Sequence, residues 1–479
     1  MKSILFAATE ATPYVKSGGL ADVVGSLPQE LVKNGVDVRV VLPLFLRVAE
    51  QYRDQAEELA TFPIRYGQFE SVCTVYKKEV DQVTFYFVQH AGYFEREGLY
   101  GYPDDGERFA FYQRAILDML DKLNYFPDII HSHDWHTGMI PFLAKELYKQ
   151  DKRYAKIKHV YTIHNLAYQG NFPKEVLGSC FGVPDQYYDN GSLRLHNGIS
   201  FMKAGIVYAD IITTVSPTYA KEILTPQFGE NLDEVLKFRE QDLYGITNGI
   251  DLEYWNPEID PNLVENYSKT NVIKGKIANK LSLQKELGLR ETKEVMVVGM
   301  VSRLVWQKGV YLILEKMAEI MGQDIQLIIL GTGEPHVENQ LRQIEDKYHR
   351  RAVYYGAYNE ELAHRIYAGS DLFLMPSLFE PCGISQLISE RYGTIPLVRE
   401  VGGLKDTIIP VNEYTGEGTG FTFSLFTGQD MVHILKYATD VYYTNRTLWK
   451  KLIKNAMESD VSWEKSAAEY IKLYSKLKK

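Results

Sequence analysis

Two short glycine-containing segments, far apart in the chain, have the composition of phosphate-binding turns. Lys16-Ser17-Gly18-Gly19-Leu20 and Glu380-Pro381-Cys382-Gly383 each follow a strand-like run and precede a helical pattern. Free backbone N–H groups at the start of a helix favour an anion, and Gly18 and Gly19 let the backbone approach it without an intervening Cβ. A tight strand-to-helix turn with an exposed lysine is the alternative for the first segment. A site that used both segments would be a cleft between two domains.

A third segment carries two cations directly after a strand-like run. Arg303 and Lys308 follow the run at 295–301 and precede an amphipathic helical pattern that extends to about Met321. Doubly wound folds bind ligands outside the carboxyl ends of their strands, and two cations before a helix suit a diphosphate there. A solvated basic loop is the alternative.

Glu380 lies just before a predicted helix, where the helix dipole and free N–H groups point outward. Its carboxylate could accept sugar hydroxyls while the backbone of Gly383, Ile384 and Ser385 holds phosphate. Ordinary capping of this helix by Glu380 is the alternative. Cys382 could be a nucleophile, but no histidine follows at a suitable spacing, so a small packed side chain is favoured.

Two further strand ends carry polar groups. The run 131–136 reads His-Ser-His-Asp-Trp-His, and alternate strand residues share one face, which raises the possibility of a metal site. The run lacks a clear carboxylate set, so we expect no metal. Asp134 and Trp135 are better candidates for sugar contact, because an indole covers sugar C–H groups and a carboxylate accepts hydroxyls. His164 and Asn165 end the next strand, in a functional or a structural role.

Aromatic residues are abundant, at 13% of the chain, which is compatible with a polysaccharide acceptor. Most of these rings are expected in the core or on ordinary surface. Tyr93-Phe94 and Tyr100-Gly101-Tyr102 are the acceptor contacts that the pattern favours.

The composition sets outer limits on the fold and the partners. A chain of 479 residues exceeds the size at which one hydrophobic core keeps growing, so two or more domains are expected. The formal charge of −9 argues against a nucleic-acid partner. Three widely separated cysteines without a Cys-x-x-Cys suit a reducing compartment. No segment reaches the ~18 apolar residues of a membrane span, and the first apolar run is too short for a signal peptide. We therefore expect a cytoplasmic protein, or the mature part of an organellar one, with no membrane partner.

Strand-like and helical patterns alternate along almost the whole chain, which predicts an α/β protein with mostly parallel sheets. In the first half the strand-like runs span 3–8, 36–42, 83–88, 129–133, 159–163 and 211–216, with helical patterns at 109–123 and 138–148. In the second half they span 295–301, 325–330, 352–356, 371–375 and 395–398. A passage rich in Asn, Gly and Pro near 250–260 separates the two series. We therefore predict two Rossmann-like doubly wound domains, 1–250 and 251–460, followed by a helix within 461–479.

Several of these motifs resemble those of the bacterial-type glycogen synthases, the family shared with plant starch synthases. The resemblance spans nearly the entire chain. The matching motifs are Lys16-Ser17-Gly18-Gly19-Leu20-Ala21-Asp22-Val23, His133-Asp134-Trp135-His136, Thr162-Ile163-His164-Asn165, Glu380-Pro381-Cys382-Gly383 and Gly402-Gly403-Leu404.

The resemblance implies the B-type glycosyltransferase fold, with an acceptor-side first domain, a nucleotide-sugar-binding second domain, and the C-terminal helix returning to the first. It implies ADP-glucose as donor and the non-reducing end of an α-1,4-glucan as acceptor. The anomeric configuration would be retained without a cofactor or metal ion. The departing phosphate oxygen would itself take the proton of the incoming hydroxyl.

The resemblance also implies roles for single residues. Arg303 and Lys308 would neutralise the departing diphosphate, with help from Lys16. Glu380 would bind the glucose hydroxyls, and His164 would contact the donor sugar. The remaining expected donor-site residues are Asp22, Asn248, Tyr358 or its neighbour Tyr355, and Cys382 and Gly383 beside the glutamate.

One position departs from a pattern that many related retaining transferases share. They carry a second glutamate eight positions after the first, where this chain has Ile388. Glycogen synthases of this type commonly lack that glutamate, so the departure fits the subfamily and removes Glu390 from the catalytic candidates. Two alternatives stay open: a UDP-glucose-dependent transferase, and a catalytically silent glucan-binding subunit of the same fold.

Overall fold

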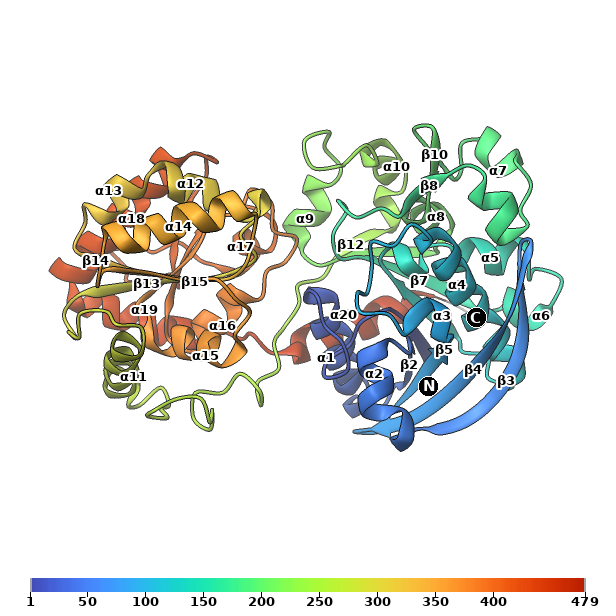
Figure 1. Cartoon of the computed structure of the whole chain (residues 1–479), viewed down its shortest axis with the longest axis horizontal. Coiled ribbons are helices and arrows are strands. Elements are labelled where there is room, and N and C mark those ends of the chain that lie inside the picture. Colours follow the sequence, from blue (N-terminus) through green and yellow to red (C-terminus); the bar gives the residue numbers. More distant parts are fainter. Residues whose placement is uncertain (1, 478–479) are drawn as a thin grey trace. The chain divides into compact units, whose positions relative to one another are not determined.

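The computed structural model describes residues 2–477 and divides into two compact units (Figure 1). Unit 1 comprises the chain up to Asn248 and the C-terminal segment from Trp463, and unit 2 comprises Gly249–Ser462. The sequence-based division puts the boundary after residue 250 and the final helix at 461–479, of which 478 and 479 lie outside the described residues. No helix in the described part of the chain is long and apolar enough to cross a membrane.

Unit 1 is built on a nine-stranded sheet. Its strands, in spatial order, are β12 (Leu243–Gly245), β11 (Ile211–Thr214), β7 (Lys158–Ile163), β6 (Ile129–His133), β1 (Ser3–Ala7), β2 (Asp37–Pro43), β5 (Val83–Gln89), β4 (Phe69–Val80) and β3 (Glu57–Tyr66). The pairings from β12 to β5 are parallel, whereas β4 pairs antiparallel with both β5 and β3. The parallel part confirms the α/β prediction.

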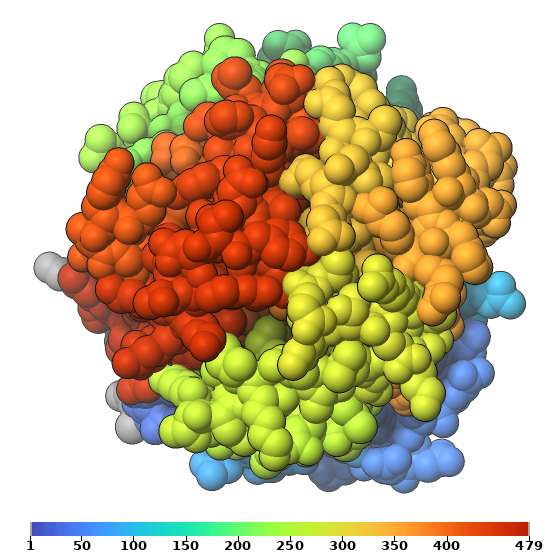
Figure 2. All heavy atoms as spheres, turned by 90° about the vertical axis from the view of Figure 1, so that its left-hand side faces the viewer, coloured from blue at the N-terminus to red at the C-terminus, as the bar shows by residue number. Residues whose placement is uncertain are grey.

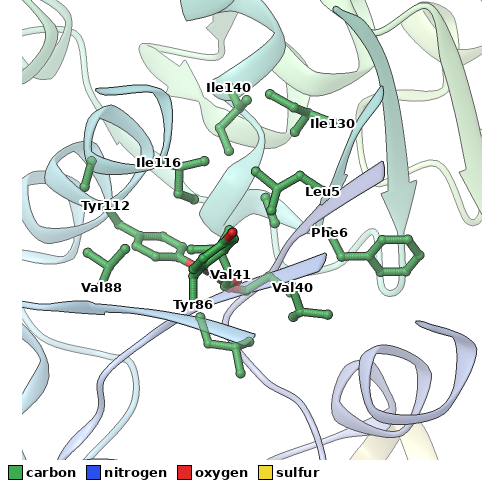
Figure 3. Close-up of a cluster of buried hydrophobic side chains, with 14 of the residues drawn as sticks. Leu5, Phe6, Val40, Val41, Tyr86, Val88, Tyr112, Ile116, Ile130 and Ile140 are labelled. Atoms are coloured by element: carbon green, nitrogen blue, oxygen red, sulfur yellow. Dashed lines mark hydrogen bonds between the residues drawn. The ribbon is translucent and has the colours of Figure 1, made fainter. Parts of the chain in front are cut away.

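The core of unit 1 lies along the central strands, because helices cover both of their faces. Four of the five residues of β1 are fully buried, as a central strand of a parallel sheet requires. Figure 3 shows Leu5 of β1 among buried side chains of β2, α4 and neighbouring elements, with Phe6 pointing away from this group. The hydroxyl of Tyr112 donates to the carbonyl oxygens of Ala8 and Val41 at 2.5 and 2.9 Å, so the one polar atom of this buried ring is satisfied.

The helices of unit 1 pack on this sheet and on one another. They are α1 (Gly19–Lys33), α2 (Leu46–Tyr52), α3 (Ala91–Phe94), α4 (Asp105–Lys122), α5 (Ile140–Glu146), α6 (Lys152–Ala155), α7 (Gln186–Asp189), α8 (Phe201–Tyr208), α9 (Pro217–Glu222), α10 (Asp233–Phe238) and α20 (Trp463–Lys476). A small antiparallel sheet holds β8 (Asn171–Pro173), β10 (Gly198–Ser200) and β9 (Arg194–Leu195). The C-terminal helix α20 packs beside α1, so the two ends of the chain meet in unit 1.

The antiparallel pair β3 and β4 does not follow from the alternation of strands and helices that the sequence suggests. Its strands alternate buried and exposed residues and carry several charges, since one of their faces lies at the surface. A strand of this kind has no continuous apolar run to reveal it. Gly67 turns the chain between the strands with φ +64°, a left-handed conformation that suits glycine.

Unit 2 is built on a six-stranded, fully parallel sheet. Its strands, in spatial order, are β15 (Ala352–Tyr355), β14 (Ile325–Leu330), β13 (Met296–Val301), β16 (Leu372–Met375), β17 (Ile395–Arg399) and β18 (Phe421–Phe423). Its helices are α11 (Val272–Glu286), α12 (Val310–Glu315), α13 (Met317–Met321), α14 (Pro335–Lys347), α15 (Glu360–Gly369), α16 (Ser385–Arg391), α17 (Gly402–Thr407), α18 (Gly428–Thr444) and α19 (Arg446–Glu458).

The single helix expected up to Met321 is two helices, α12 and α13, separated at Lys316. The break lies where Gly428, the first residue of α18, packs against the side chain of Lys316. Figure 2 shows the face of unit 2 on which the red surface of α18 meets the yellow surface of this helix pair. The strand order places β13 and β16 at the centre of the sheet, and the segments that follow them carry the cations and Glu380.

Candidate active site

In unit 1 the N-terminus of α1 is open to a ligand. Gly18 is the N-cap residue of this helix and offers no side chain to bond the first backbone N–H groups. Ser17, Gly18 and Gly19 are exposed, and a Cβ built on Gly18 would meet no other atom within 4 Å. The first turn therefore presents its N–H groups and its positive end to the surface, as an anion site requires.

A glutamate that the sequence did not single out holds this turn in place. The carboxylate of Glu10, only 3% exposed, accepts hydrogen bonds from the backbone N–H and the hydroxyl of Ser17, the latter at 2.7 Å. The hydroxyl of Tyr100 donates to the same carboxylate at 2.7 Å. Glu10 is therefore a positioning residue for the glycine turn. The sequence shows it only as one acidic residue after a strand, and nothing in that pattern reveals its partners.

Lys16 does not extend freely from the turn. Its ammonium lies 2.7 Å from a carboxylate oxygen of Asp22, one helical turn into α1. Both residues are predicted donor-site residues, and the structure brings them together. Asp22 holds the cation beside the exposed start of the helix, where a phosphate would meet both.

The carboxyl ends of β6 and β7 meet through a backbone contact of Asp134. Its carboxylate accepts the backbone N–H of His164 at 2.8 Å and a hydrogen bond from the backbone of Asn165. Burial raises the pKa of Asp134 to about 7, while these two hydrogen bonds oppose the rise. The sequence suggested that this carboxylate accepts sugar hydroxyls. In the structure it fixes the loop that carries His164, and its contact with a sugar stays a prediction.

The ring of His164 is fixed by a second histidine. Nε2 of His164 lies 2.9 Å from Nδ1 of His133, in a fully buried contact. Burial lowers the pKa of His164 to about 3 and that of His133 well below its ordinary value, so both rings are neutral at pH 7. Each neutral ring then carries one N–H proton. In the hydrogen bond between the rings, one of the two facing nitrogens is the donor and the other is the acceptor.

The surroundings of His133 decide which nitrogen donates. Nε2 of His133 is buried without a hydrogen-bond partner among residues 2–477. A proton there would be an orphaned buried N–H, which native structures strongly avoid. We therefore assign the proton of His133 to Nδ1, which donates to His164. His164 consequently carries its own proton on Nδ1 and presents a donor, not an acceptor, on the outer side of the ring.

The ring of His133 is itself held through the C-terminal helix. It stacks on His131 with ring centroids 4.2 Å apart. Nδ1 of His131 lies 2.7 Å from the hydroxyl of Tyr474 on α20, and its Nε2 lies 2.6 Å from the hydroxyl of Thr162. A continuous set of ring contacts and hydrogen bonds thus joins α20 to His164. The described residues include no group of three His, Cys, Asp or Glu side chains arranged to hold a metal ion.

Trp135 packs against His136 with centroids 4.0 Å apart, and its indole is also flanked by Phe172 and the backbone of Gly170. These contacts hold the indole in place, and its contact with a sugar stays a prediction. Two other aromatic predictions for unit 1 need correction. Tyr93 and Phe94 were expected at the acceptor, but both are buried. The aromatic content of a sequence shows how many rings the chain has, but not which of them are buried.

The other polar candidates of unit 1 lie at segment ends. Asn165 uses its side-chain oxygen to accept the backbone N–H of Ala167 at 3.1 Å, which shapes the loop after β7. Asn248, the last residue of the first segment of unit 1, is buried, and its side-chain oxygen has no hydrogen-bond partner in the described chain. An unpaired buried acceptor of this kind is available to a ligand hydroxyl.

In unit 2 the structure brings together Lys308 and Glu380, which are 72 positions apart. The ammonium of Lys308 lies 2.6 and 2.8 Å from the two carboxylate oxygens, and the hydroxyl of Ser377 donates to one of them at 3.0 Å. The side chain of Glu380 is 7% exposed and that of Lys308 is 19% exposed. The carboxylate of Glu380 therefore fixes the ammonium of Lys308 in position and compensates its charge, and both groups are largely shielded from solvent.

The loop after β13 reaches this pair by close backbone packing. Gly309 has φ +75°, and a Cβ there would lie 1.9 Å from the carbonyl oxygen of Pro376. The backbone N–H of Leu378 donates to the carbonyl oxygen of Gln307 at 2.8 Å. Arg303 begins the same loop with an exposed side chain, and its guanidinium makes no hydrogen bond or ion pair within the described part of the chain. It is free to bind an anion.

Glu380 is not a helix cap. The N-cap residue of α16 is Ile384, which provides no side-chain hydrogen bond, and the helix begins at Ser385. The capping alternative for Glu380 is therefore wrong. Gly383 has φ +78°, so the chain turns there in a conformation that suits glycine and leaves the first N–H groups of α16 uncapped. Cys382 is 4% exposed and forms no disulfide, which fits the small packed side chain favoured from the sequence.

The second glycine pair packs directly on the Glu380 segment. A Cβ on Gly402 would lie 1.9 Å from the carbonyl oxygen of Glu380, and one on Gly403 would lie 2.1 Å from that of Cys382. The backbone N–H of Gly403 donates to the carbonyl oxygen of Glu380 at 3.0 Å. Only glycine permits this approach, so the motif at 402–404 is a support for the segment that carries Glu380.

The two tyrosine candidates lie at the carboxyl end of β15, an edge strand of the sheet: Tyr355 is its last residue and Tyr358 follows it. Tyr358 is 80% exposed, whereas Tyr355 is 37% exposed and its hydroxyl accepts a hydrogen bond from the amide of Asn359 at 3.2 Å. Of the two, Tyr358 has the more exposed ring, and its hydroxyl donates to Glu360 at 3.1 Å. The ring is suited to stacking on a flat ligand group such as a base.

Comparisons with known proteins agree with this arrangement. Residues 3–238 match the starch synthase catalytic domain family, and residues 280–433 match the glycosyl transferases group 1 family. A glycogen synthase from Desulforamulus reducens is 49% identical over 99% of this chain and 98% of its own length. A glycogen synthase from Ligilactobacillus salivarius is 48% identical over 99% of both chains.

Solved structures show the same fold. The catalytic domain of starch synthase IV from Arabidopsis thaliana, bound to ADP and acarbose, is 34% identical, with a TM-score of 0.91 and 99% of both chains covered. Sucrose-phosphate synthase from Thermosynechococcus elongatus has a TM-score of 0.62 at 17% identity, which shows a likeness of fold alone. The two units are the Rossmann-like domains of the B-type glycosyltransferase fold, and the chain belongs to the glycogen synthase family of glycosyltransferases.

Proposed function

We propose that this protein transfers glucose from ADP-glucose to the non-reducing end of an α-1,4-glucan, with retention of the anomeric configuration. The observation that carries the proposal is the contact between Lys308 and Glu380 beside the uncapped start of α16. It supplies a fixed cation for a departing diphosphate and a carboxylate for sugar hydroxyls. The relatives named glycogen synthase and the starch synthase bound to ADP and acarbose support the same donor and acceptor classes.

The charge arrangement of unit 2 suits a leaving diphosphate. Arg303 has a free guanidinium, which can bind two phosphate oxygens at once, and Lys308 adds a point charge. The uncapped N–H groups that begin α16 add partial positive charge. Because these groups are fixed before the reaction, they stabilise the charge that develops on the leaving oxygen without reorganising. In unit 1, the resemblance implies that Lys16 binds phosphate and that His164 contacts the donor sugar.

The proposed reaction is a displacement on one face of the sugar. The bond between the anomeric carbon and the phosphate oxygen breaks, and a new bond forms from the same carbon to the 4-hydroxyl oxygen of the acceptor. The hydroxyl proton passes to the departing phosphate oxygen, so ADP leaves with the electron pair and the proton. Glu380 accepts hydroxyl hydrogen bonds and stays unmodified. A covalent glucosyl group trapped on Glu380 would contradict this mechanism.

We propose that the transfer needs no metal ion, since cations and helix N–H groups supply the charge stabilisation that a divalent ion would otherwise give. The three cysteines form no disulfide, which suits the reducing cytoplasm. The sugar-nucleotide donor and the glucan acceptor are then all that the transfer requires.

The test is incorporation of labelled glucose into glycogen, measured in EDTA with ADP-glucose or UDP-glucose, for the wild type and Glu380→Ala. We expect incorporation from ADP-glucose that is lost in the variant. Incorporation from UDP-glucose alone would favour the UDP-glucose-dependent alternative. No incorporation from either donor, with glycogen binding retained, would favour the catalytically silent glucan-binding subunit.

A further inference from the structure

An exposed aromatic ring lies in the loop that carries the two cations, between Arg303 and Lys308. Trp306 is 58% exposed, an unusual position for the largest apolar side chain. Its indole contacts Phe426 in the loop after β18, with ring centroids 6.2 Å apart and planes at 79°. Leu425, next to Phe426, is 65% exposed. These three residues form an apolar surface, here called the Trp306 patch.

The strand order places the Trp306 patch on a definite side of the site. The sheet runs β15, β14, β13, β16, β17, β18, so Tyr358 and Phe426 follow strands at opposite edges. With neighbouring strands about 4.8 Å apart, β18 lies roughly 14 Å from β13. The contact between the rings of Trp306 and Phe426 therefore crosses the carboxyl ends of the two strands between them. The strand before Glu380, β16, is one of these. The patch therefore lies near the segment that leads to Glu380, on the side away from the exposed tyrosine ring.

The patch is held rigidly. The loop of Trp306 is bonded to the segment before Glu380 by the amide of Gln307, which donates to the carbonyl oxygen of Phe379 at 3.3 Å. The guanidinium of Arg399 donates to the carbonyl oxygens of Leu378 at 2.6 Å and Ser424 at 3.0 Å, so it bonds the β18 loop to the same segment.

The tip of the β18 loop is also fixed. The carboxylate of Asp430 accepts the backbone N–H groups of Ser424 and Leu425 at 3.1 and 2.8 Å. The exposed apolar side chains therefore do not result from a loose loop. A preorganised surface loses little conformational entropy when it binds a ligand.

The rim of the patch is polar. Glu400, the residue after β17, accepts hydrogen bonds from the hydroxyls of Thr422 at 2.7 Å and Ser424 at 3.2 Å. These carboxylate and hydroxyl groups retain further capacity to accept and donate. An indole face bordered by such groups matches a sugar ring, which presents apolar C–H faces and hydroxyls at its edge.

We propose that the Trp306 patch binds the α-glucan acceptor, as a subsite of unit 2 that holds glucose units beyond the one that reacts. The proposal rests on the proposed function, in which the acceptor's terminal hydroxyl meets the donor sugar beside Glu380. A polymer with its end there must continue away from the nucleotide, and the patch lies on that side.

A second copy of the chain is a poorer occupant. A stable protein interface buries about 800 Å² on each partner. Three side chains that are already partly covered do not provide such an area. A charged partner is not favoured either, because the side chains of the patch are apolar and the guanidinium of Arg399, which lies over the ring of Phe426, is engaged with backbone oxygens.

The test compares Trp306→Ala, Trp306→Phe and a control, Tyr414→Ala. Tyr414 is 92% exposed in unit 2, in a loop with no contact to the patch. We expect Trp306→Ala to raise the KM for glycogen about 10-fold and Trp306→Phe to raise it less, while the KM for ADP-glucose stays within about twofold. A 10-fold change corresponds to about 1.4 kcal/mol, the scale of a ring-stacking contact. Tyr414→Ala should change neither constant.

Affinity electrophoresis in glycogen gels, without donor, measures binding independently of transfer. Weaker retention of Trp306→Ala supports the subsite even if the wild type transfers no glucose, an outcome that would reject the proposed function instead. Unchanged retention and an unchanged KM for glycogen would overturn the subsite. A rise in the KM for ADP-glucose as large as that for glycogen would overturn it too. So would a wild-type dimer in sedimentation that Trp306→Ala converts to a monomer.

Discussion

The ammonium of Lys308 lies within 2.8 Å of both carboxylate oxygens of Glu380, and this contact shapes what each residue contributes. The carboxylate is the more buried partner, at 7% exposure against 19%. It compensates the lysine charge until a diphosphate arrives. The lysine in turn allows a carboxylate to be buried beside the site, which would otherwise be costly.

The two partners should therefore respond differently to substitution. Lys308→Ala leaves a buried carboxylate without its cation and should lower the free energy of unfolding by about 1–3 kcal/mol. Glu380→Gln keeps the shape and leaves the lysine able to reach solvent, so it should cost less. Both should reduce kcat/KM for ADP-glucose at least 100-fold. Urea unfolding and steady-state kinetics check the two expectations, and equal losses of stability would contradict the asymmetry.

Gly18 offers a separate test of the glycine turn in unit 1. A Cβ there meets nothing within 4 Å, and its φ of −161° is extended backbone that any residue adopts. Gly18→Ala should leave the free energy of unfolding within about 0.5 kcal/mol of the wild type. If phosphate approaches this backbone closely, the KM for ADP-glucose should nevertheless rise. Gly178→Ala is the matched control, since it is exposed and equally uncrowded. An unchanged KM for ADP-glucose in Gly18→Ala would show that phosphate does not bind closely at this turn.

The contact of His133 with His164 predicts a measurable tautomer. Nitrogen-15 NMR should find His164 neutral and protonated on Nδ1 at pH 7. In His133→Asn the side-chain amide can still donate to His164, whereas His133→Phe cannot. The phenylalanine variant should lose about 10-fold or more in kcat/KM, because one buried hydrogen bond is worth about 1 kcal/mol and the ring loses its orientation as well.

The tautomer signal separates positioning from general stability. His133→Asn should restore both the Nδ1-protonated signal of His164 and most of the activity. A phenylalanine variant with full activity, or a wild-type His164 protonated on Nε2, would show that His133 only packs.

The sequence predicted the central strands well because their burial leaves a continuous apolar run. The expected strand at 129–133 coincides with β6, and the one at 325–330 with β14. The hairpin of β3 and β4 was missed since one of its faces lies at the surface and carries charges. Periodicity finds elements that are buried on both sides more readily than half-exposed ones.

The chemistry was predicted less evenly. Glycine turns and cations at strand ends follow from local pattern, and so Lys308 and Glu380 were both found. Their contact was not, because it joins positions 72 residues apart. Glu10 was missed for the same reason, since its partners Ser17 and Tyr100 are visible only after folding. Asp134 was predicted to contact a sugar, but its hydrogen bond to the loop of His164 was not predicted, because that contact joins two separate strand ends.

Glu390 is a buried carboxyl group outside the expected catalytic set. It lies on α16 with 1% exposure, and burial raises its pKa to about 8, although hydrogen bonds from Thr419 and Ser459 oppose the rise. The folded protein therefore holds a proton that the unfolded chain releases above about pH 4.5. Folding stability should fall as the pH rises from about 4.5 to 8, by up to about 1.4 kcal/mol per pH unit from this group.

Glu390→Gln replaces the protonated acid with a neutral group of the same shape and removes this dependence. Urea unfolding should show little difference between variant and wild type at pH 5, and a more stable variant at pH 8. Glu361→Gln, whose glutamate is 77% exposed on α15, is the control and should not produce this growing difference. Glucose transfer should survive in Glu390→Gln, because a carboxyl group enclosed in the core of unit 2 has no access to substrate. A variant that folds stably but has lost transfer would return Glu390 to the catalytic candidates.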